Sequence, residues 1–332
     1  MTATPLKRGL PVVALGGVTL VIVTLGAPFI GSTGLHLARV FTRAVPFADN
    51  VDAQIFFLAR LPRALAAALV GCALSAAGVV FQGLLRNPLA TPYTLGVSAG
   101  AALGAMVAIT FGAAWPVGGV ATASLAGALL AVLVVYALAS ARHRGLSTTV
   151  LLLSGVTLNA FFSALILFVQ YLSDFAETYR ALRWLMGDLD VASYAPIVAA
   201  LPFVVIAFVA FAWLARPLNL LSLGADAAGA RGLNVNRAQR LAFLSGSLAT
   251  GAAVSVGGPI GFVGIIVPHL VRLIVGADHR LVLPASTFFG AAFLVGCDVV
   301  ARTALSPLEL PVGVITAILG GPFFLWLLLK KH

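Results

Sequence analysis

Lysine is missing from the interior of this chain. Lys7, Lys330 and Lys331 are the only lysines among its 332 residues. A phosphate-binding loop of the form G-x-x-x-x-G-K-[ST] needs a lysine beside a glycine-rich turn, and no such segment occurs. The chain is therefore not a P-loop ATPase by itself. If ATP drives its function, another subunit hydrolyses it.

Cysteines and metal-ligand patterns are also scarce. The two cysteines, Cys72 and Cys297, lie inside apolar runs, which is typical of small packing residues rather than of a disulfide framework. The histidines form neither H-E-x-x-H nor a pairing with C-x-x-C. They are His36, His143, His269, His279 and His332. The sequence predicts no metal site.

Charged residues are the third scarcity. Only 9% of the residues are charged, 61% are hydrophobic, and the mean hydropathy is +1.09. These values are typical of polytopic membrane proteins. A net charge of +10 would indicate nucleic acid in a soluble protein, but here the charges lie between apolar runs. We therefore expect a lipid bilayer around the chain and no nucleic-acid partner.

Apolar runs of about 20 residues, the length that crosses a bilayer, recur through the chain. The first exceeds the apolar core of a signal peptide, so we favour a first transmembrane helix over a signal peptide. The eighth run is short and broken by glycine and proline. The ten candidate spans are 11–31, 64–85, 94–112, 116–139, 149–172, 195–214, 239–256, 260–275, 281–301 and 311–329.

Ten crossings place both ends of the chain on one side of the membrane. With the ends inside, internal segments hold 13 of the 20 basic residues and outer segments hold 7. Acidic residues are biased the other way: two lie inside, seven outside, and Asp298 lies within a helix. The positive-inside rule then predicts that both ends are cytoplasmic.

Glycine and arginine spacing adds two structural expectations. Gly96, Gly100 and Gly104 form a small-xxx-small face that lets another helix approach closely. Arg60-Leu-Pro-Arg63 precedes the second span much as Arg237-Ala-Gln-Arg240 precedes the seventh. This similarity suggests an inverted repeat, with chance likeness between glycine-rich helices as the alternative.

Several motifs occur in order along most of the chain. They are Arg60-Leu-Pro-Arg63, Gln82-Gly-Leu-Leu-Arg-Asn-Pro-Leu-Ala90, Leu95-Gly-Val-Ser-Ala-Gly100, Gly258-Pro-Ile-Gly-Phe-Val-Gly264, Pro268-His269, Arg272, Asp278-His-Arg280 and Glu309-Leu-Pro-Val-Gly313. Together, over roughly residues 55–330, they resemble the permease subunit of the type II ABC importers for vitamin B12, haem and iron siderophores. Arg231 departs from the family pattern, which has an apolar residue at that position.

The resemblance implies an all-α polytopic fold of about ten transmembrane helices in a single permease domain, residues 1–332, in the bacterial inner membrane. It implies a homodimer with two ATP-binding-cassette ATPase subunits and a periplasmic substrate-binding protein. The chain would be a transport subunit and not an enzyme. No cofactor would be bound by the chain itself, and ATP and Mg would be bound by the partner ATPase.

Two sets of site residues follow from the resemblance on the cytoplasmic side. The coupling loop, about 215–238, would dock the ATPase, with a solvated amphipathic loop as the alternative. Its residues are Leu223, Gly224, Asp226, Ala228, Arg231 and Gly232. A cytoplasmic gate would be formed by Asn87, Leu89, Ser147 and Thr148, and ordinary turn chemistry explains the Asn87-Pro88 pair equally well.

Two further sets complete the predicted sites. Arg60, Arg63 and Arg302 would form ion pairs with acidic residues of the binding protein. The alternative is that these side chains snorkel to lipid phosphates. Arg302 also has a possible partner in Asp298, four residues earlier. The broken stretch from Gly257 to Arg280 would be a transmission element whose charged end, Arg272 through Arg280, faces the ATPase. Its residues are Gly261, Gly264, Pro268, His269 and Arg272. His269 and His279 are expected to have a structural or ATPase-facing role rather than to be haem ligands.

The sequence therefore predicts a permease for an iron chelate, with a lean to haem and with cobalamin as the close alternative. Few polar residues occur in the expected helices, so specificity should reside in the binding protein. An ion-coupled secondary transporter needs carboxylates in mid-membrane, and Asp298 is the one candidate. A structural membrane anchor is a third class.

Overall fold

A computed structural model describes residues 5–31, 33–42, 45–112, 119–141, 147–191 and 193–330. Some residues that enter the sequence argument lie outside this part. They are Arg43, Arg142, His143, Arg144, Lys331 and His332, together with the side chains of Lys7, Arg8 and Lys330.

The described part of the chain is helical, and ten long helices match the ten predicted spans. They are α1 (Pro5–Gly26), α4 (Leu61–Leu85), α5 (Val97–Thr110), α6 (Gly119–Ser140), α7 (Thr148–Leu172), α9 (Ala195–Leu221), α11 (Val235–Gly257), α12 (Val263–Val275), α13 (His279–Thr303) and α14 (Val312–Lys330). Six stretches are long and apolar enough to cross a membrane, and α5, α12 and α14 are shorter apolar helices. The predicted all-α membrane fold is confirmed.

Short helices connect the long ones, and apart from α10 (Ala225–Ala230), which lies in the predicted coupling loop, the sequence analysis did not predict them. They are η1 (Ala27–Phe29), α2 (Leu37–Val40), η2 (Phe47–Asp49), α3 (Val51–Gln54), the π-helix η3 (Ile55–Arg60), η4 (Pro92–Leu95), α8 (Phe175–Leu185) and α10 (Ala225–Ala230). A capping box opens α8: Asp174 Oδ1 accepts from the Glu177 amide at 2.7 Å, and Glu177 Oε2 accepts from the Asp174 amide at 3.0 Å. This D-x-x-E signal is visible in the sequence.

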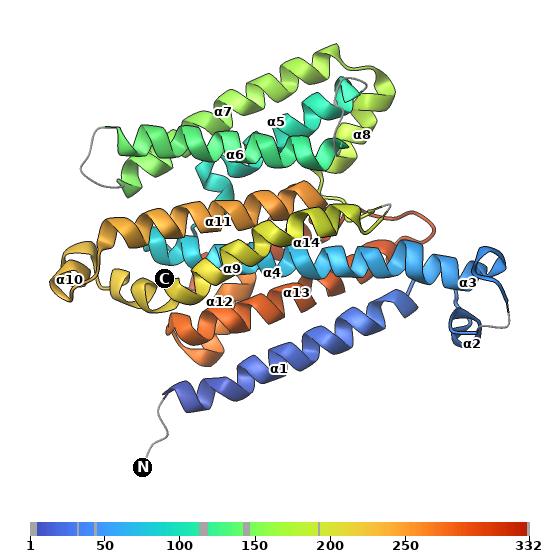
Figure 1. Cartoon of the computed structure of the whole chain (residues 1–332), viewed down its shortest axis with the longest axis horizontal. Helices are drawn as coiled ribbons and strands as arrows, with labels where there is room; N and C mark the ends of the chain where they lie inside the picture. The colour runs from blue at the N-terminus through green and yellow to red at the C-terminus, as the bar shows by residue number, and fades with distance from the viewer. Residues whose placement is uncertain are drawn as a thin grey trace.

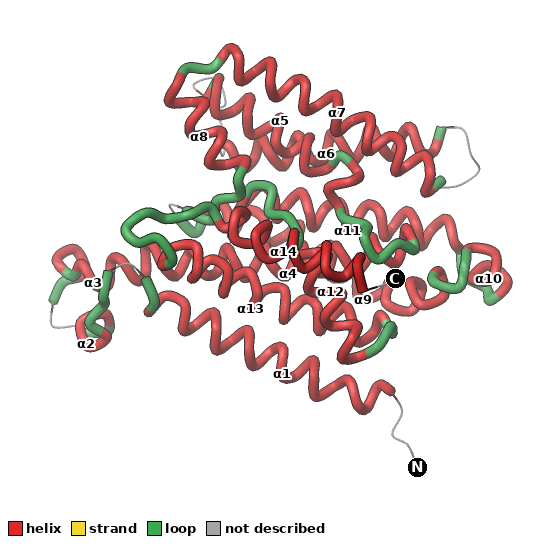
Figure 2. Tube along the Cα trace, turned by 180° about the vertical axis from the view of Figure 1, so that it is seen from behind, coloured by secondary structure: helices red, strands yellow, loops and turns green. Residues whose placement is uncertain are grey.

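The helices run side by side, so the bundle has two ends (Figure 1). We call the end that holds α10 and both chain termini the inner end, and the end that holds α2 and α3 the outer end. Helices α5 to α8 form a layer of their own against α11, as the opposite view also shows (Figure 2). The shared location of the two termini agrees with the predicted even number of crossings.

Helix α4 is the core of the bundle. Of its 25 residues 19 are buried, mostly alanine, glycine and valine. A Cβ atom on Gly71 would lie 2.4 Å from the Gly290 carbonyl oxygen of α13, and one on Gly78 would lie 2.1 Å from the Gly264 carbonyl oxygen of α12. Small residues therefore allow direct backbone contact between these helices.

The predicted small-xxx-small face of α5 also packs tightly. A Cβ atom on Gly100 would lie 2.5 Å from the Gly127 carbonyl oxygen of α6, and one on Gly104 would lie 2.1 Å from the Ala123 carbonyl oxygen. Gly96 differs, because it precedes α5 with a left-handed φ of 83°. The packing interpretation is confirmed for the two helical glycines.

The eighth predicted span is short and broken, as expected. Helix α11 ends at Gly257, Gly258 has a φ of 68°, and α12 begins after Phe262, whose φ is also 68°. A phenylalanine in the left-handed region is uncommon and requires support from its surroundings. The Phe262 ring lies against Gly320 of α14, where a Cβ atom would lie 2.2 Å from it.

Candidate functional site

A cluster of buried charges lies at the outer end, between α4 and α13. Arg63 Nε is 2.7 Å from Asp298 Oδ1, and Arg63 Nη1 also binds Glu309 Oε2. Asp298 is 0% exposed, while the Glu309 side chain is 41% exposed. Because a buried charge is costly without a partner, each member of this cluster depends on the others.

Arg302 joins the same cluster. Its Nε lies 3.4 Å from Asp298 Oδ2, one helical turn along α13, so the pairing suggested by the sequence is confirmed. Arg302 Nη2 also donates to the Ala27 carbonyl at 2.8 Å. The arginine thus links the outer end of α13 to the segment that follows α1.

Arg60 holds that segment as well. Its Nη1 donates to the Pro28 carbonyl at 3.2 Å, and its Nη2 donates to the Thr33 carbonyl at 2.5 Å. Both acceptors are carbonyl oxygens, and Arg60 forms no ion pair within the described ranges. Among the cluster arginines, Arg60 is therefore the one whose charge has no carboxylate in contact.

A cavity of about 800 Å³ opens between these groups. It is lined by Arg60, Arg63, Arg183 and Arg302, with Asp190 and Glu309 among its other residues. The structure thus brings the three predicted docking arginines together. They are only 7%, 7% and 3% exposed, so a carboxylate of a docking partner would have to enter this cavity to contact them. Docking itself stays a prediction.

Arg183 reaches the cavity from α8, which the sequence analysis missed. Its Nη2 lies 2.6 Å from Asp188 Oδ2 and 3.9 Å from Asp190 Oδ2. The Asp188 carboxylate, with Asp190, raises the pKa of Arg183 above its ordinary value. Arg183 therefore brings an arginine to the α8 side of the cavity, where Asp188 and Asp190 balance its charge.

The predicted coupling loop forms a protruding turn at the inner end (Figure 1). Leu223 is 55% exposed, Asp226 and Arg231 are exposed, and Ala228 is fully buried against the bundle. Gly224 and Gly232 flank α10 with φ values of 108° and 82°. Only glycine adopts such values without strain, so both glycines are required for this shape. Contact with an ATPase stays a prediction.

The predicted gate residues occupy turn and cap positions. Asn87 Oδ1 accepts from the Leu89 amide at 2.9 Å, and Ser147 Oγ accepts from the Val150 amide at 3.4 Å at the start of α7. Thr148 is the first residue of α7, and Leu89 is 37% exposed. The turn-chemistry alternative is confirmed for Asn87, and gating stays a prediction.

Gln82 of α4 organises the predicted transmission element. Its Nε2 donates to the Gly264 carbonyl at 2.9 Å, and its Oε1 accepts from Arg272 Nη1. Gln82 belonged to a quoted motif but received no role in the sequence analysis. Arg272 was expected to face the ATPase side. Its side chain contacts Gln82 and supplies a donor to that buried amide, and a role toward the ATPase stays a prediction.

The other members of the transmission element differ in their surroundings. Pro268 is buried within α12, and the His269 ring lies 5.9 Å from the Phe323 ring of α14 in an edge-on arrangement. A Cβ atom at Gly261 would meet open space. The structural interpretation of His269 is supported by this ring contact.

An asparagine that the sequence analysis missed joins α9 to α13 at the inner end. Asn219 Nδ2 donates to Asp278 Oδ1 at 2.7 Å, and Asn219 Oδ1 accepts from the His279 amide at 2.9 Å. Hydrogen bonds from Arg280 and Asn219 hold the pKa of Asp278 well below its usual range. Asp278 therefore stays ionised while it caps α13.

Comparisons with known proteins bear on nearly the whole chain. The model of the FecCD transport family matches residues 19–330. The cobalamin import system permease protein BtuC of Halobacterium salinarum is 46% identical over 274 residues, which are 82% of this chain and 73% of the relative. The hemin transport system permease protein HmuU of Yersinia pestis is 37% identical over 319 residues, 95% of this chain and 94% of the relative. A solved structure of a metal-chelate type ABC transporter in an inward-facing conformation is 34% identical and superposes with a TM-score of 0.83, covering 96% of this chain and 99% of that one.

Proposed function

The chain belongs to the FecCD transport family, and we propose that it carries an iron chelate, haem or a ferric siderophore, from the periplasm to the cytoplasm. Its relatives are permease subunits of ABC importers, so it is a multi-pass inner-membrane transport component and not an enzyme. The cargo is the part that we propose.

The match to the hemin permease carries the cargo proposal. It covers 95% of this chain, and the solved neighbour is a transporter of the metal-chelate type. Cobalamin is the second candidate, since a cobalamin permease is 46% identical over a shorter region. Haem and cobalamin are both bulky metal complexes, so one wide and weakly binding path suits either.

Vesicles that contain the permease, its ATPase and its binding protein test the cargo. We expect ATP-dependent accumulation of haem, and none when the binding protein is omitted. Accumulation of cobalamin without haem would support the second candidate. Uptake of none of haem, a ferric siderophore and cobalamin, in vesicles whose ATPase is active, would contradict both proposals.

We further propose that two copies of this single permease domain, residues 1–332, work with two ATPase subunits and a binding protein. The protruding loop with α10 supports an ATPase contact at the inner end. The arginine-lined cavity supports binding-protein contact at the outer end. ATP and Mg would act on the ATPase subunits, and no cofactor is assigned to this chain.

Alternating access is the mechanism that this arrangement supports. Helix α4 carries the Arg63 ion pair near one end and Gln82 near the other, 19 residues or about 29 Å apart. Movement of α10 would reach α13 through Asn219, and α12 touches α4 through Gln82. Packed helices with two stable arrangements are a known basis for such transitions.

The rival mechanism, ion-coupled transport through Asp298, loses support. A coupling carboxylate needs access to the transport path. Asp298 is fully buried, ion-paired with Arg63 and contacted by Arg302 at the outer end. These contacts favour a structural role for Asp298.

A further inference from the structure

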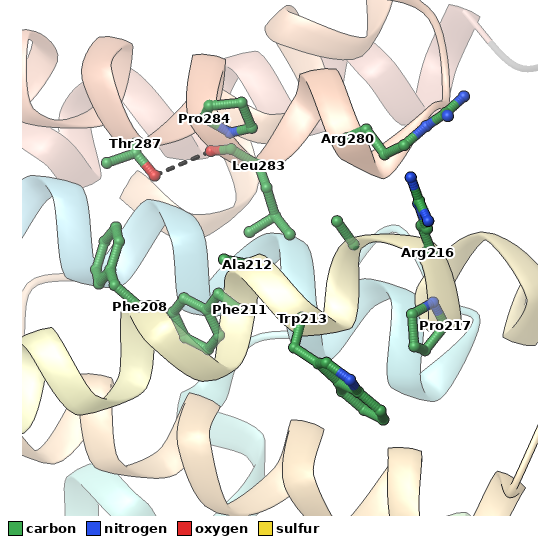
Figure 3. A pocket seen from close by; sticks show the side chains of 11 residues that line it. Phe208, Phe211, Ala212, Trp213, Arg216, Pro217, Arg280, Leu283, Pro284 and Thr287 are labelled. Atoms are coloured by element: carbon green, nitrogen blue, oxygen red, sulfur yellow. Dashed lines mark hydrogen bonds between the residues drawn. The ribbon is translucent and has the colours of Figure 1, made fainter.

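An apolar groove of about 720 Å³ runs between α9 and α13 at the inner end of the bundle. Its walls are Phe208, Phe211 and Trp213 on α9, with Leu283 and Thr287 on α13. Arg216 and Arg280 lie together at one end of it (Figure 3). The groove is therefore apolar along its length and cationic at its mouth.

The groove has the depth of part of an acyl chain. Arg216 and Phe208 are eight residues apart on α9, which is about 12 Å along the helix. Arg280 and Thr287 span a similar length on the facing helix. The mouth lies near the inner end and the apolar wall extends towards the middle of the bilayer, which is the orientation of a phospholipid in the inner leaflet.

The charges at the mouth favour an anion. Arg216 is exposed and makes no hydrogen bond or ion pair within the described residues. Arg280 is bound on one edge by Asp278, through its Nε and Nη2. The guanidinium carbon of Arg237, on α11, lies 5.9 Å from the centre of the Trp213 ring. Arg216 and Arg280 thus lie at the mouth with one carboxylate, and Arg237 adds a further positive charge beside Trp213.

Two prolines add polar acceptors to this mouth. Pro217 has no amide hydrogen for the carbonyl of Trp213 one turn earlier, and Pro284 has none for the carbonyl of Arg280. Carbonyls that lack this helical donor suit the hydroxyls of a glycerol headgroup. Zwitterionic headgroups carry a cation that these arginines repel.

We propose that this groove is a binding site for an anionic phospholipid of the inner leaflet. Its phosphate would lie between Arg216 and Arg280, and one acyl chain would lie along Phe208, Ala212 and Thr287. Basic pockets between transmembrane helices on the cytoplasmic side are suited to such lipids. The site is separate from the arginine cavity at the outer end.

Trp213 provides a direct probe of the groove. A full-length variant with Trp115→Phe, Trp184→Phe and Trp326→Phe keeps it as the single tryptophan. This protein is placed in vesicles that contain dibrominated phosphatidylglycerol or dibrominated phosphatidylcholine with the same acyl chains. Bromine quenches tryptophan at contact, so the ratio of the two quenching curves gives the lipid preference at Trp213.

We expect phosphatidylglycerol to quench at a lower mole fraction than phosphatidylcholine. Arg216→Gln should reduce this preference about fivefold, and Arg216→Gln with Arg280→Gln should abolish it. Arg231→Gln, which removes the same charge from the loop after α10, is the matched control and should keep the preference. Arg216 makes no hydrogen bond, so its substitution leaves the fold intact, which size-exclusion chromatography verifies.

Three outcomes would overturn the proposal. Equal quenching by the two lipids would remove the selectivity, and a preference that survives the double substitution would assign it to other charges. Quenching by neither lipid, with cross-linking between copies that carry Phe208→Cys, would show that a second copy covers the groove.

Discussion

Gly78 of α4 and Gly264 of α12 touch backbone to backbone. A Cβ atom built on Gly78 would lie 2.1 Å from the Gly264 carbonyl oxygen, a distance that real Cβ atoms do not show. The same Gly264 carbonyl accepts the Gln82 amide at 2.9 Å. The position of α12 against α4 is thus fixed by a contact between backbone atoms, which cannot move aside as a flexible side chain can.

Gly78→Ala should therefore separate α4 from α12. The methyl group meets backbone and not a flexible side chain, so we expect a loss of about 1–3 kcal/mol in stability, as in overpacked cores. Thermal unfolding in detergent measures this. Gly296→Ala is the matched control, because a Cβ atom at that position in α13 meets open space. A control that unfolds as early as Gly78→Ala would contradict the steric explanation.

Asp298→Asn should destabilise the outer end. It leaves Arg63 and Arg302 buried without their common carboxylate, and breaking a buried ion pair in this way costs about 3–5 kcal/mol. The melting temperature and ATP-driven uptake should fall together. Asp190→Asn, at a side chain 63% exposed, should change neither by much. Lost uptake with an unchanged melting temperature and intact ATPase coupling would instead favour the ion-coupled rival.

Gly224 and Gly232 should be needed for coupling between ATP hydrolysis and transport. Bulky residues at these positive φ values strain the turns on both sides of α10 by about 1–2 kcal/mol each. We expect ATPase activity to persist in the assembled complex while uptake falls. Gly229→Ala lies inside α10, where a Cβ atom meets open space, and should transport normally. Normal uptake in the Gly224 and Gly232 variants would contradict their predicted role in coupling.

Arg60 is the docking residue best separated from the internal ion pairs. Arg60→Gln removes the charge and also the Nη donors to the Pro28 and Thr33 carbonyls; the part of the effect that belongs to docking is a fall in affinity for the binding protein that is largest at low salt. Exposed ion pairs contribute about 0.2–1 kcal/mol, so we expect a few-fold change, largest in the association rate. Surface plasmon resonance at two salt concentrations measures it, with Arg39→Gln as the control. An unchanged salt dependence would remove Arg60 from the docking site.

Asp278 should make the inner end sensitive to acid. Its pKa is lowered in the folded protein, so its stabilising effect is complete above the ordinary aspartate pKa of about 3.9 and is lost as the pH falls towards the folded value. The difference in melting temperature between the native protein and Asp278→Asn should be constant from pH 7 to 5. It should shrink towards pH 3. A difference that grows on acidification would reverse the assigned sign.

Apolar run length was sufficient to predict the long helices, because each must cover the same thickness of hydrocarbon. The short helices α2, α3 and α8 were not predicted, since their lengths of 4, 4 and 11 residues lie below the run length of about 20 residues that a span requires. A contact between residues close in sequence could also be predicted. Asp298 and Arg302 are one helical turn apart, and the sequence analysis named them as a possible pair.

Contacts between residues that are distant in sequence could not be predicted. Arg63 and Asp298 are 235 residues apart, and only the packing of α4 on α13 brings them together. Gln82 and Asn219 are polar residues in apolar helices, where the sequence does not distinguish a buried contact from a surface position. For the same reason, the internal partners of the predicted docking arginines appeared only in three dimensions.

The separation between Arg63 and Asp298 also affects how the protein is made. Helix α4 leaves the ribosome long before α13, so Arg63 enters the bilayer without its carboxylate, at a cost of up to about 3 kcal/mol for an arginine at depth. During that interval Arg60 and Arg63 can reduce this cost by extending their side chains to the interface. Synthesis of α13 then supplies Asp298 and Arg302. The ion pairs of the buried cluster therefore form late in biogenesis, and only in chains whose ninth span has inserted in the correct orientation.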